Sequence, residues 1–260
     1  MDEKLQLRIY GDDSLPTLIY LPGLHGDWTL VGSFRKHVTG KVRFVEMTYP
    51  RTLVWSLNDY AAAIEAALAE NGITHGWLLG ESFGSQILWA MVGRKRFQAD
   101  GIILAGGFVR LPMRRALQLA DRIFGEIALA LVTQIIFPVT NKTFAWLYTK
   151  LARCRFRTAP ETLEKINEFL ERRTRLDFKA AQHRLHLIAQ NNPRATAQST
   201  SVPVFALSGW LDPLVPWFVV RRWLRKNCPA LRDYKIIQGD HAVLVSAPKE
   251  SAGQILEWIL

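Results

Sequence analysis

The sequence predicts an α/β fold in which a doubly wound, mostly parallel sheet carries an inserted helical cap. Short strand-like runs alternate with helical runs over residues 1–107 and 202–260, and such alternation is typical of parallel sheets. Some of the strand-like runs are apolar along most of their length, as expected for strands covered on both faces. Residues 108–201 show only helical patterns. A chain of 260 residues that is 49% hydrophobic is long and apolar enough to bury such a core.

Seven segments have the composition of strands, because they are short, mostly apolar and bounded by Gly, Pro or Asp. They are residues 5–10, 17–21, 42–47, 76–79, 101–105, 202–207 and 234–238. The first places Leu5, Leu7 and Ile9 at alternate positions, which is the period of a strand. The second is apolar along almost its whole length, which predicts a buried strand.

Local signals also predict helices between these strands. Ser56 and Asp59 have the spacing of a capping box at the start of a helix. Residues 82–92 are apolar nearly all round, as expected for a helix buried against a sheet, and Gly93 is predicted to end this helix. Pro248 stands near the first turn of a last helix with one apolar side.

Residues 108–201 interrupt the alternation of strands and helices. Three or four helices are predicted there, over residues 113–137, 142–154, 160–173 and 176–190. Residues 191–193 and the polar residues 196–201 are predicted to form a linker that returns the chain to the sheet. We therefore expect a core made of residues 1–107 and 202–260, with the helical insertion forming a cap over the carboxyl edge of its strands.

The positive charge of the chain is concentrated in the predicted cap. The sequence has 33 Lys and Arg against 23 Asp and Glu, a net charge of +10, and residues 108–201 contain 16 Lys and Arg against 7 Asp and Glu. Three interpretations stay open: a solvated helical face, a docking surface for an acidic acyl-carrier protein or the phosphates of an acyl-CoA, or attraction to an anionic membrane. Nucleic acid is not an expected partner, because the sequence has no helix-turn-helix, zinc-finger or aromatic-basic sheet motif.

Other features of the sequence exclude further classes of protein. Cys154 and Cys228 stand alone, which predicts a reducing compartment rather than a disulfide scaffold. His183 and His186 lack further ligand-like residues nearby, so neither a metal nor another cofactor is expected. The start of the chain lacks the pattern of a signal peptide, and residues 127–139, the longest apolar run, are fewer than the roughly 20 that span a bilayer. The sequence therefore predicts a cytoplasmic protein without a transmembrane segment.

A serine-centred motif carries the strongest chemical signal. Residues 80–85 read Gly-Glu-Ser-Phe-Gly-Ser, directly after a predicted strand and at the start of the buried helix. A serine held at such a corner has strained backbone angles, and the residues two positions away must be small for the chain to close. Gly80, Gly84 and the neighbouring Ser85 meet this need for small side chains. The pattern predicts that Ser82 is a nucleophile at a strand-to-helix turn.

A serine hydroxyl needs a general base, and the base needs a group that fixes its tautomer. Of the six histidines, His241 is the one that directly follows a late strand, so it is the candidate base. Asp212, just after the sixth predicted strand, is the candidate carboxylate. Asp240 and Glu81 are rivals, but adjacent side chains on an extended segment point apart. We predict that Ser82 meets the candidate base and carboxylate at the carboxyl edge of one sheet.

Hydrolysis through such a serine also requires donors for the oxyanion of the tetrahedral intermediate. The N–H of Phe83 is one candidate, and the N–H of Leu24, in the turn after an early strand, is the other. His25 in this turn and Trp210 in the Asp212 loop are candidate substrate contacts. For His25, packing within the turn is the alternative.

Together these motifs resemble those of α/β-hydrolases of the capped esterase, lipase and thioesterase type. The resemblance extends from residue 17 to the C-terminus and rests on the order Ser82, Asp212 and His241, each after its own strand. The turn departs from the His-Gly form that is usual in the family, because Pro22 and Gly23 stand in that place.

The resemblance implies a serine hydrolase that cleaves an ester or thioester through an acyl-enzyme, with a small-molecule substrate and no cofactor. The architecture is also similar to that of the carrier-protein methyl esterase of biotin synthesis, which docks an acidic partner through arginines of its cap. An acyl-carrier protein or acyl-CoA substrate is therefore an alternative. C–C bond hydrolysis, perhydrolysis and a non-catalytic binding role remain further alternatives, because they occur on the same fold.

Overall fold

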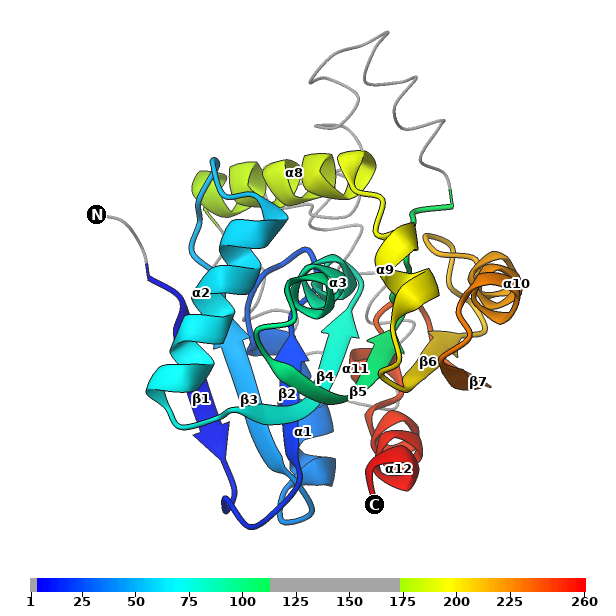
Figure 1. The fold of residues 1–260 in the computed structure, drawn as a ribbon, viewed down its shortest axis with the longest axis horizontal. Coiled ribbons are helices and arrows are strands. Elements are labelled where there is room, and N and C mark those ends of the chain that lie inside the picture. The colour runs from blue at the N-terminus through cyan, green and yellow to red at the C-terminus, as the bar shows by residue number, and fades with distance from the viewer. Residues whose placement is uncertain (1–3, 113–173) are drawn as a thin grey trace, which may run out of the picture.

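The computed structural model describes residues 4–112 and 174–260, which form a seven-stranded sheet with helices on both faces (Figure 1). The strands lie in the order β1-β3-β2-β4-β5-β6-β7. β1 pairs antiparallel with β3, and every other pair of neighbours is parallel. The strands are β1 (Gln6–Tyr10), β2 (Thr17–Leu21), β3 (Arg43–Thr48), β4 (His75–Glu81), β5 (Gln98–Ala105), β6 (Val204–Gly209) and β7 (Leu231–Ile237). The predicted α/β fold with a mostly parallel sheet is confirmed.

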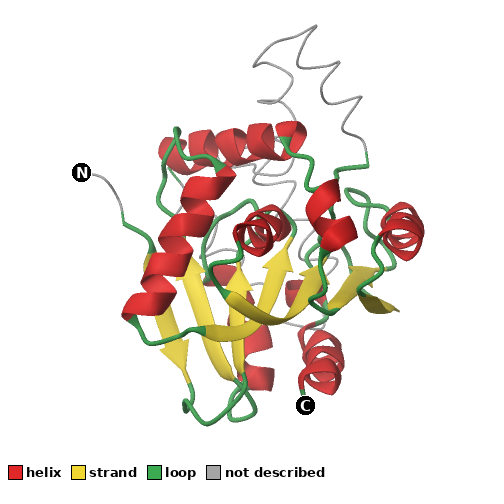
Figure 2. Cartoon of the chain, in the orientation of Figure 1, coloured by secondary structure: helices red, strands yellow, loops and turns green. Residues whose placement is uncertain are grey.

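Helices connect the strands and cover the sheet (Figure 2). The described helices are η1 (Thr29–Val31, a 3-10 turn), α1 (Gly32–Val38), α2 (Leu57–Glu70), α3 (Gly84–Arg94), α8 (Arg175–Gln190), α9 (Arg194–Ser199), α10 (Trp217–Asn227), α11 (Val243–Ser246) and α12 (Pro248–Ile259). Residues of α2, α3, α8, α9 and α10 belong to the apolar cluster on one face of the sheet. Residues of α1, α11 and α12 belong to the cluster on the other.

Strand β2 shows how the sequence builds this two-sided core. Ile19 and Leu21 belong to one apolar cluster, whereas Leu18 and Tyr20 belong to the other. Successive side chains of a strand point to opposite faces, so a strand in the middle of two helical layers must be apolar at every position. This requirement explains the nearly continuous apolar run of the second predicted strand.

The capping box predicted at the start of α2 is confirmed. The Ser56 side chain accepts a hydrogen bond from the N–H of Asp59, and the Asp59 carboxylate accepts one at 2.7 Å from the N–H of Ser56. These bonds satisfy two backbone donors that lie at or before the first helical turn.

The prediction that Gly93 ends the helix after Ser82 is wrong. Helix α3 continues through Gly93 to Arg94, and Lys95 follows in the left-handed conformation with φ of +54°. The small residue has a packing role instead, because a Cβ on Gly93 would lie only 3.3 Å from Oγ1 of Thr196. A glycine inside a helical pattern therefore marked a close approach of another segment rather than a helix end.

The polar linker predicted at residues 196–201 also differs from the structure. Helix α9 occupies most of it, and Ala197 is fully buried where α9 packs against α3. Its polar composition concealed the helix, because this short element is stabilised by packing on a neighbour rather than by an apolar stripe of its own.

The described part of the predicted cap is its C-terminal end. The helix predicted over residues 176–190 is confirmed as α8, whose buried residues Ala181, Leu185 and Ile188 join the core cluster on the α2 and α3 face. The helices predicted over residues 113–137, 142–154 and 160–173, together with Cys154, lie outside the described residues. The cap limits at 108 and 201 therefore stay predictions. Within residues 4–112 and 174–260, no helix is both long and apolar enough to cross a membrane.

Candidate active site

Three strands of the sheet carry the candidate catalytic side chains at their carboxyl ends. Ser82 directly follows β4, Asp212 lies in the loop after β6, and His241 lies in the loop after β7. Strands β4 to β7 are parallel and successive in the sheet, so their carboxyl ends share one edge. The sheet thus brings together residues that are far apart along the chain.

The three side chains form a continuous hydrogen-bonded chain. His241 Nε2 lies 2.8 Å from Ser82 Oγ, and His241 Nδ1 lies 2.8 Å from Asp212 Oδ2. A carboxylate at Asp212 can only accept, so Nδ1 carries the proton and Nε2 has its lone pair toward the hydroxyl of Ser82. The Asp212 side chain is fully buried, whereas that of His241 is 18% exposed. This tautomer is the one that a general base for a serine hydroxyl needs.

The backbone around Ser82 has the strained corner that the motif predicts. Ser82 has φ of +48°, in the left-handed region that favours glycine. A Cβ on Gly80 would lie 2.8 Å from the Cα of Ser85, and a Cβ on Gly84 would overlap the carbonyl oxygen of Leu21. Both glycines are therefore required by close approach of backbone, which explains the spacing of the motif.

Ser85 fixes the elbow through its hydroxyl, a role that the sequence did not indicate beyond the need for a small side chain. Its Oγ lies 2.6 Å from the carbonyl oxygen of Ser82 and accepts a hydrogen bond at 3.2 Å from the N–H of Phe108. Ser85 is fully buried. The hydroxyl thus ties the corner that holds the candidate nucleophile to the loop after β5.

The Asp212 loop holds its carboxylate in a fixed orientation. Oδ1 accepts hydrogen bonds from the N–H groups of Leu214 at 2.9 Å and Val215 at 2.8 Å, so Oδ2 is left to face His241.

The backbone of His241 is approached closely by the loop after β5. Gly106 in this loop is left-handed, with φ of +55°, and a Cβ there would overlap the His241 carbonyl oxygen.

The two rival carboxylates make other contacts. Glu81 is buried and accepts a hydrogen bond at 2.5 Å from the hydroxyl of Tyr20. Asp240 accepts one at 2.7 Å from the N–H of Ala242. Among the hydrogen bonds of the described residues, the carboxylate on His241 is that of Asp212.

The candidate oxyanion donors lie in the two turns that the sequence indicates. Phe83 is the residue before the first turn of α3, and Leu24 lies in the turn between β2 and η1. Both side chains are buried. Within the described residues, no backbone hydrogen bond uses the N–H of Leu24 or Phe83. The N–H of Phe83, at the start of α3, is suited to holding a negative charge.

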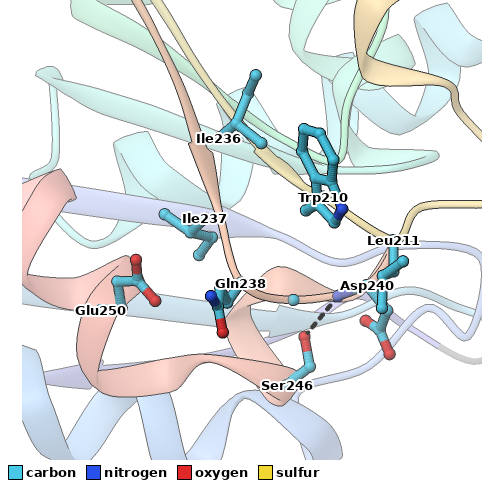
Figure 3. A pocket seen from close by; sticks show the side chains of 9 residues that line it. Trp210, Leu211, Ile236, Ile237, Gln238, Asp240, Ser246 and Glu250 are labelled. Atoms are coloured by element: carbon cyan, nitrogen blue, oxygen red, sulfur yellow. Dashed lines mark hydrogen bonds between the residues drawn. The ribbon is translucent and has the colours of Figure 1, made fainter.

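The two candidate substrate contacts have different surroundings. His25 is mostly buried, with Nε2 4.0 Å from Oε2 of Glu81 and its ring against Gly23. Trp210 is 59% exposed, and its ring centroid lies 5.5 Å from that of Trp217. Trp210 also lines a cavity of about 680 Å³ beside β7, together with Leu211, Gln238 and Glu250 among others (Figure 3). The lining of this cavity contains none of the three hydrogen-bonded side chains described above.

One buried side chain near the site was missed in the sequence. Arg184 of α8 is only 2% exposed and donates hydrogen bonds to the carbonyl oxygens of Leu24 at 3.0 Å and Pro50 at 3.3 Å. A signal was present, because Arg184 falls on the same helical side as the buried Ala181 and Ile188. An arginine within an apolar stripe differs from one on a solvated face, but its partners on other elements cannot be read from the sequence.

No metal-binding arrangement accompanies these residues in the described part of the chain, where no group of three or more His, Cys, Asp or Glu could hold an ion. The described site brings together a serine, an imidazole and a carboxylate.

Solved structures with the same fold are numerous, and the three described next are distant from this chain in sequence. The chain is similar to an esterase from Thermogutta terrifontis, with a TM-score of 0.71, 19% identity and coverage of 98% of this chain and 92% of the esterase. It is similar to an enol-lactonase from Burkholderia xenovorans, with a TM-score of 0.72, 15% identity and coverage of 98% and 95%. A hydrolase from Pseudomonas aeruginosa gives a TM-score of 0.75 at 13% identity, with coverage of 98% and 93%.

A comparison with curated protein sequences found no significant match. A comparison with family profiles matched residues 48–248 to the alpha/beta hydrolase fold family. This match covers well over half of the chain, includes Ser82, Asp212 and His241, and agrees with the order of strands and helices in the sheet. The chain is therefore a member of the alpha/beta hydrolase fold family.

Proposed function

We propose that the protein is a serine hydrolase that cleaves carboxylic esters or thioesters through an acyl-enzyme formed on Ser82. The observation that carries this proposal is the hydrogen-bonded chain from Ser82 through His241 to Asp212, with both bonds at 2.8 Å. The strained corner at Ser82 supports it. The N–H groups of Phe83 and Leu24 are the proposed oxyanion donors.

In the proposed reaction, His241 Nε2 takes the proton of Ser82 as its oxygen attacks the substrate carbonyl. The N–H groups of Phe83 and Leu24 stabilise the oxyanion, and the Asp212 carboxylate stabilises the imidazolium. The imidazolium then gives its proton to the leaving alcohol or thiol, and the acyl group stays on Ser82. A water molecule, deprotonated by His241, attacks this ester, and the carboxylic acid leaves as Ser82 regains its proton.

The similar structures support ester cleavage as the reaction class. Their names include esterases and an enol-lactonase, and both kinds of enzyme act on an ester bond. At 19% identity or less, this likeness supports the reaction class through the fold and does not narrow the acyl group or the alcohol.

Turnover of p-nitrophenyl butyrate tests the proposal. Wild-type protein should hydrolyse it, and Ser82→Ala should lower kcat by about 10⁴-fold or more, because the residues of such a triad act as a unit. Ser14→Ala is the control, since it removes an exposed hydroxyl outside the site and should leave turnover unchanged. Equal turnover by wild type and Ser82→Ala would refute the proposal.

The narrower hypothesis of an acyl-carrier protein or acyl-CoA substrate stays a prediction, because most arginines of the basic segment lie outside the described residues. The effect of ionic strength on the rate distinguishes a charged acyl-carrier or acyl-CoA substrate from a small neutral ester. Hydrolysis of an acyl-carrier substrate should fall steeply with salt if docking depends on charge, whereas hydrolysis of p-nitrophenyl butyrate should change little. An unchanged rate with the carrier substrate would remove this hypothesis.

A further inference from the structure

The buried guanidinium of Arg184 binds the loop that holds Leu24. Its Nη1 donates to the Leu24 carbonyl at 3.0 Å, its Nη2 donates to the Pro50 carbonyl at 3.3 Å, and its Cζ lies 5.5 Å from the centre of the Tyr49 ring. The loop backbone is shaped around this group. A Cβ on Gly26, which has φ of +79°, would overlap Nη1.

A buried cation lowers the stability of the fold unless its contacts compensate for the lost hydration. Within the described residues, Arg184 forms no ion pair with a carboxylate, and its Nε has no hydrogen-bond partner. Moving a charged group out of water costs several kcal/mol when no opposite charge accompanies it. An apolar side chain of the same length could fill this space without that cost. We therefore expect the guanidinium to have a role beyond packing. Its two hydrogen bonds to backbone carbonyls indicate that this role is to hold the loop backbone.

We propose that Arg184 is a positioning residue for the turn at residues 22–26, which carries the second oxyanion donor of the proposed function. The turn is held at Pro22, whose carbonyl accepts a hydrogen bond at 3.2 Å from the hydroxyl of Tyr49, and at Leu24 by Arg184. The N–H of Leu24 belongs to the peptide that joins residues 23 and 24, whose carbonyl accepts a hydrogen bond at 3.0 Å from the N–H of Gly26. Holding the carbonyls of Pro22 and Leu24 fixes the peptides on both sides of it and so restricts the direction of this N–H.

Arg184→Met tests this proposal against Arg194→Met as a control. Arg194 is another partly buried arginine, in α9, and lies over the ring of Trp223 rather than on the turn. We expect Arg184→Met to lower kcat about 10- to 100-fold with little change in KM, because oxyanion donors act in the transition state and a displaced donor costs less than a deleted one. Arg184→Lys should recover part of kcat, and Arg194→Met should leave kcat of the folded enzyme unchanged.

Hydrogen exchange separates this proposal from the proposed function. The amides of residues 23–26 should exchange faster in Arg184→Met and at the wild-type rate in Arg194→Met, whether or not the protein turns over an ester. Unchanged exchange, or equal loss of stability in both variants with unchanged kcat, would overturn the positioning role. Absence of Ser82-dependent turnover in the wild type would instead overturn the proposed function, and the exchange result would still decide the role of Arg184.

A separate observation concerns the surface formed by the Asp212 loop and α10. Large apolar side chains are exposed there: Trp210 at 59%, Leu211 at 73%, Leu214 at 38%, Phe218 at 60% and Val219 at 40%. Exposed apolar residues scattered singly need no explanation, but a cluster on one continuous segment indicates an interaction site.

The same helix adds positive charge to this cluster. Buried Val220 and Leu224 face the core, while Arg222, Arg225 and Lys226 are exposed. Residues 213–232 contain no Asp or Glu. Helix α10 thus combines aromatic and aliphatic side chains with cations and no opposing charge. Exposed aromatic and aliphatic side chains beside cations are suited to the interface of an anionic bilayer, where Trp and Phe enter the headgroup region and cations bind lipid phosphates.

We infer that the surface formed by residues 210–219 and the cations of α10 docks on an anionic lipid bilayer. Because this surface includes the loop that holds Asp212, docking would place the carboxyl edge of the sheet toward the lipid. Binding is electrostatic and apolar in combination, so it should require anionic lipid and weaken in high salt.

Co-sedimentation with vesicles tests the inference. Wild-type protein should bind vesicles of phosphatidylcholine mixed with phosphatidylglycerol and bind pure phosphatidylcholine weakly. Changing Arg222, Arg225 and Lys226 together to Gln should weaken binding about 100-fold, because each cation near such a surface contributes about fivefold. Phe218→Ser should weaken the binding that remains in high salt.

The control changes Lys41, Lys95 and Arg96 to Gln. These residues are exposed and precede β3 and β5, at the opposite edge of the sheet from the Asp212 loop, so the control removes the same charge elsewhere. It should bind nearly as wild type does. Equal weakening in both triple variants would show attraction by net charge alone and overturn the proposed surface. No vesicle binding by the wild type would also overturn it and leave this face to a protein partner.

Discussion

At the scale of the residue, the proposed chemistry depends on one imidazole in one tautomer. Asp212 is buried and its second oxygen is held by two backbone N–H groups, so the contact with His241 Nδ1 has a fixed direction. Esterase activity should therefore fall on the acid side, because a protonated His241 cannot accept the proton of Ser82. A profile of kcat/KM against pH measures this, and a flat profile between about pH 5 and about pH 9 would contradict it.

The glycines of the elbow offer a second residue-scale prediction. Gly84→Ala should lower the free energy of unfolding by more than about 2 kcal/mol, because the new methyl group would overlap the fixed backbone oxygen of Leu21. Gly253→Ala is the control. It lies within α12 with nothing within 4 Å of the added Cβ, and should raise stability by about 0.5–1 kcal/mol. Urea unfolding measures both, and a similar change in the two variants would refute the packing argument.

At the scale of the element, polar contacts outside the apolar side of α8 bind this helix to the loop after β3. Its first turn has a capping box between Thr174 and Asp177, and Arg51 donates to the Asp177 carboxylate at 2.7 Å. His183 Nε2 lies 2.9 Å from the Trp55 carbonyl oxygen. The C-terminal end of the insertion is thus bound to the loop after β3 through polar contacts.

These contacts predict a pH-dependent contribution to stability. Burial acts to raise the pKa of Asp177, but hydrogen bonds from Thr174 and the charge of Arg51 outweigh it, so the pKa lies below the ordinary value of 3.8. A lowered pKa means that the folded state favours the carboxylate. The contribution of the Asp177 carboxylate to stability is therefore complete above pH 3.8, and it is lost as the pH falls through the lower pKa of the folded state.

Asp177→Asn should accordingly lower the free energy of unfolding by about 1–2 kcal/mol at neutral pH. The difference from wild type should shrink below pH 3.8. Urea unfolding at a series of pH values measures this, with the exposed Asp13→Asn as control. A difference that stays constant into the acid range would contradict the ionic account.

Elements differ in how far the sequence predicts them. All seven strands were predicted to within a few residues, because each has a compact apolar run between turn residues. Helices α1, α9, α10 and α11 were missed. Three of them are short, and α10 follows a Pro-rich loop and has only a narrow buried side around Val220 and Leu224. Such helices are stabilised by packing on other elements, and the local sequence does not show which elements those are.

At the scale of the whole molecule, the sheet explains why the candidate site could be predicted at all. Parallel strands end at one edge, so residues that follow β4, β6 and β7 converge although Ser82 and His241 are 159 residues apart. Contacts such as Arg184 with Leu24, or His183 with Trp55, depend on how α8 packs against the loops after β2 and β3. No rule of spacing along the chain predicts those partners.

The central claim is that Ser82 is a nucleophile activated by His241. Labelling with a fluorophosphonate probe, followed by mass spectrometry of the labelled peptide, tests it most directly. We expect one adduct on Ser82 in the wild type, no adduct in Ser82→Ala and much slower labelling in His241→Ala. Labelling that persists in Ser82→Ala, or proceeds at the wild-type rate in His241→Ala, would contradict the account.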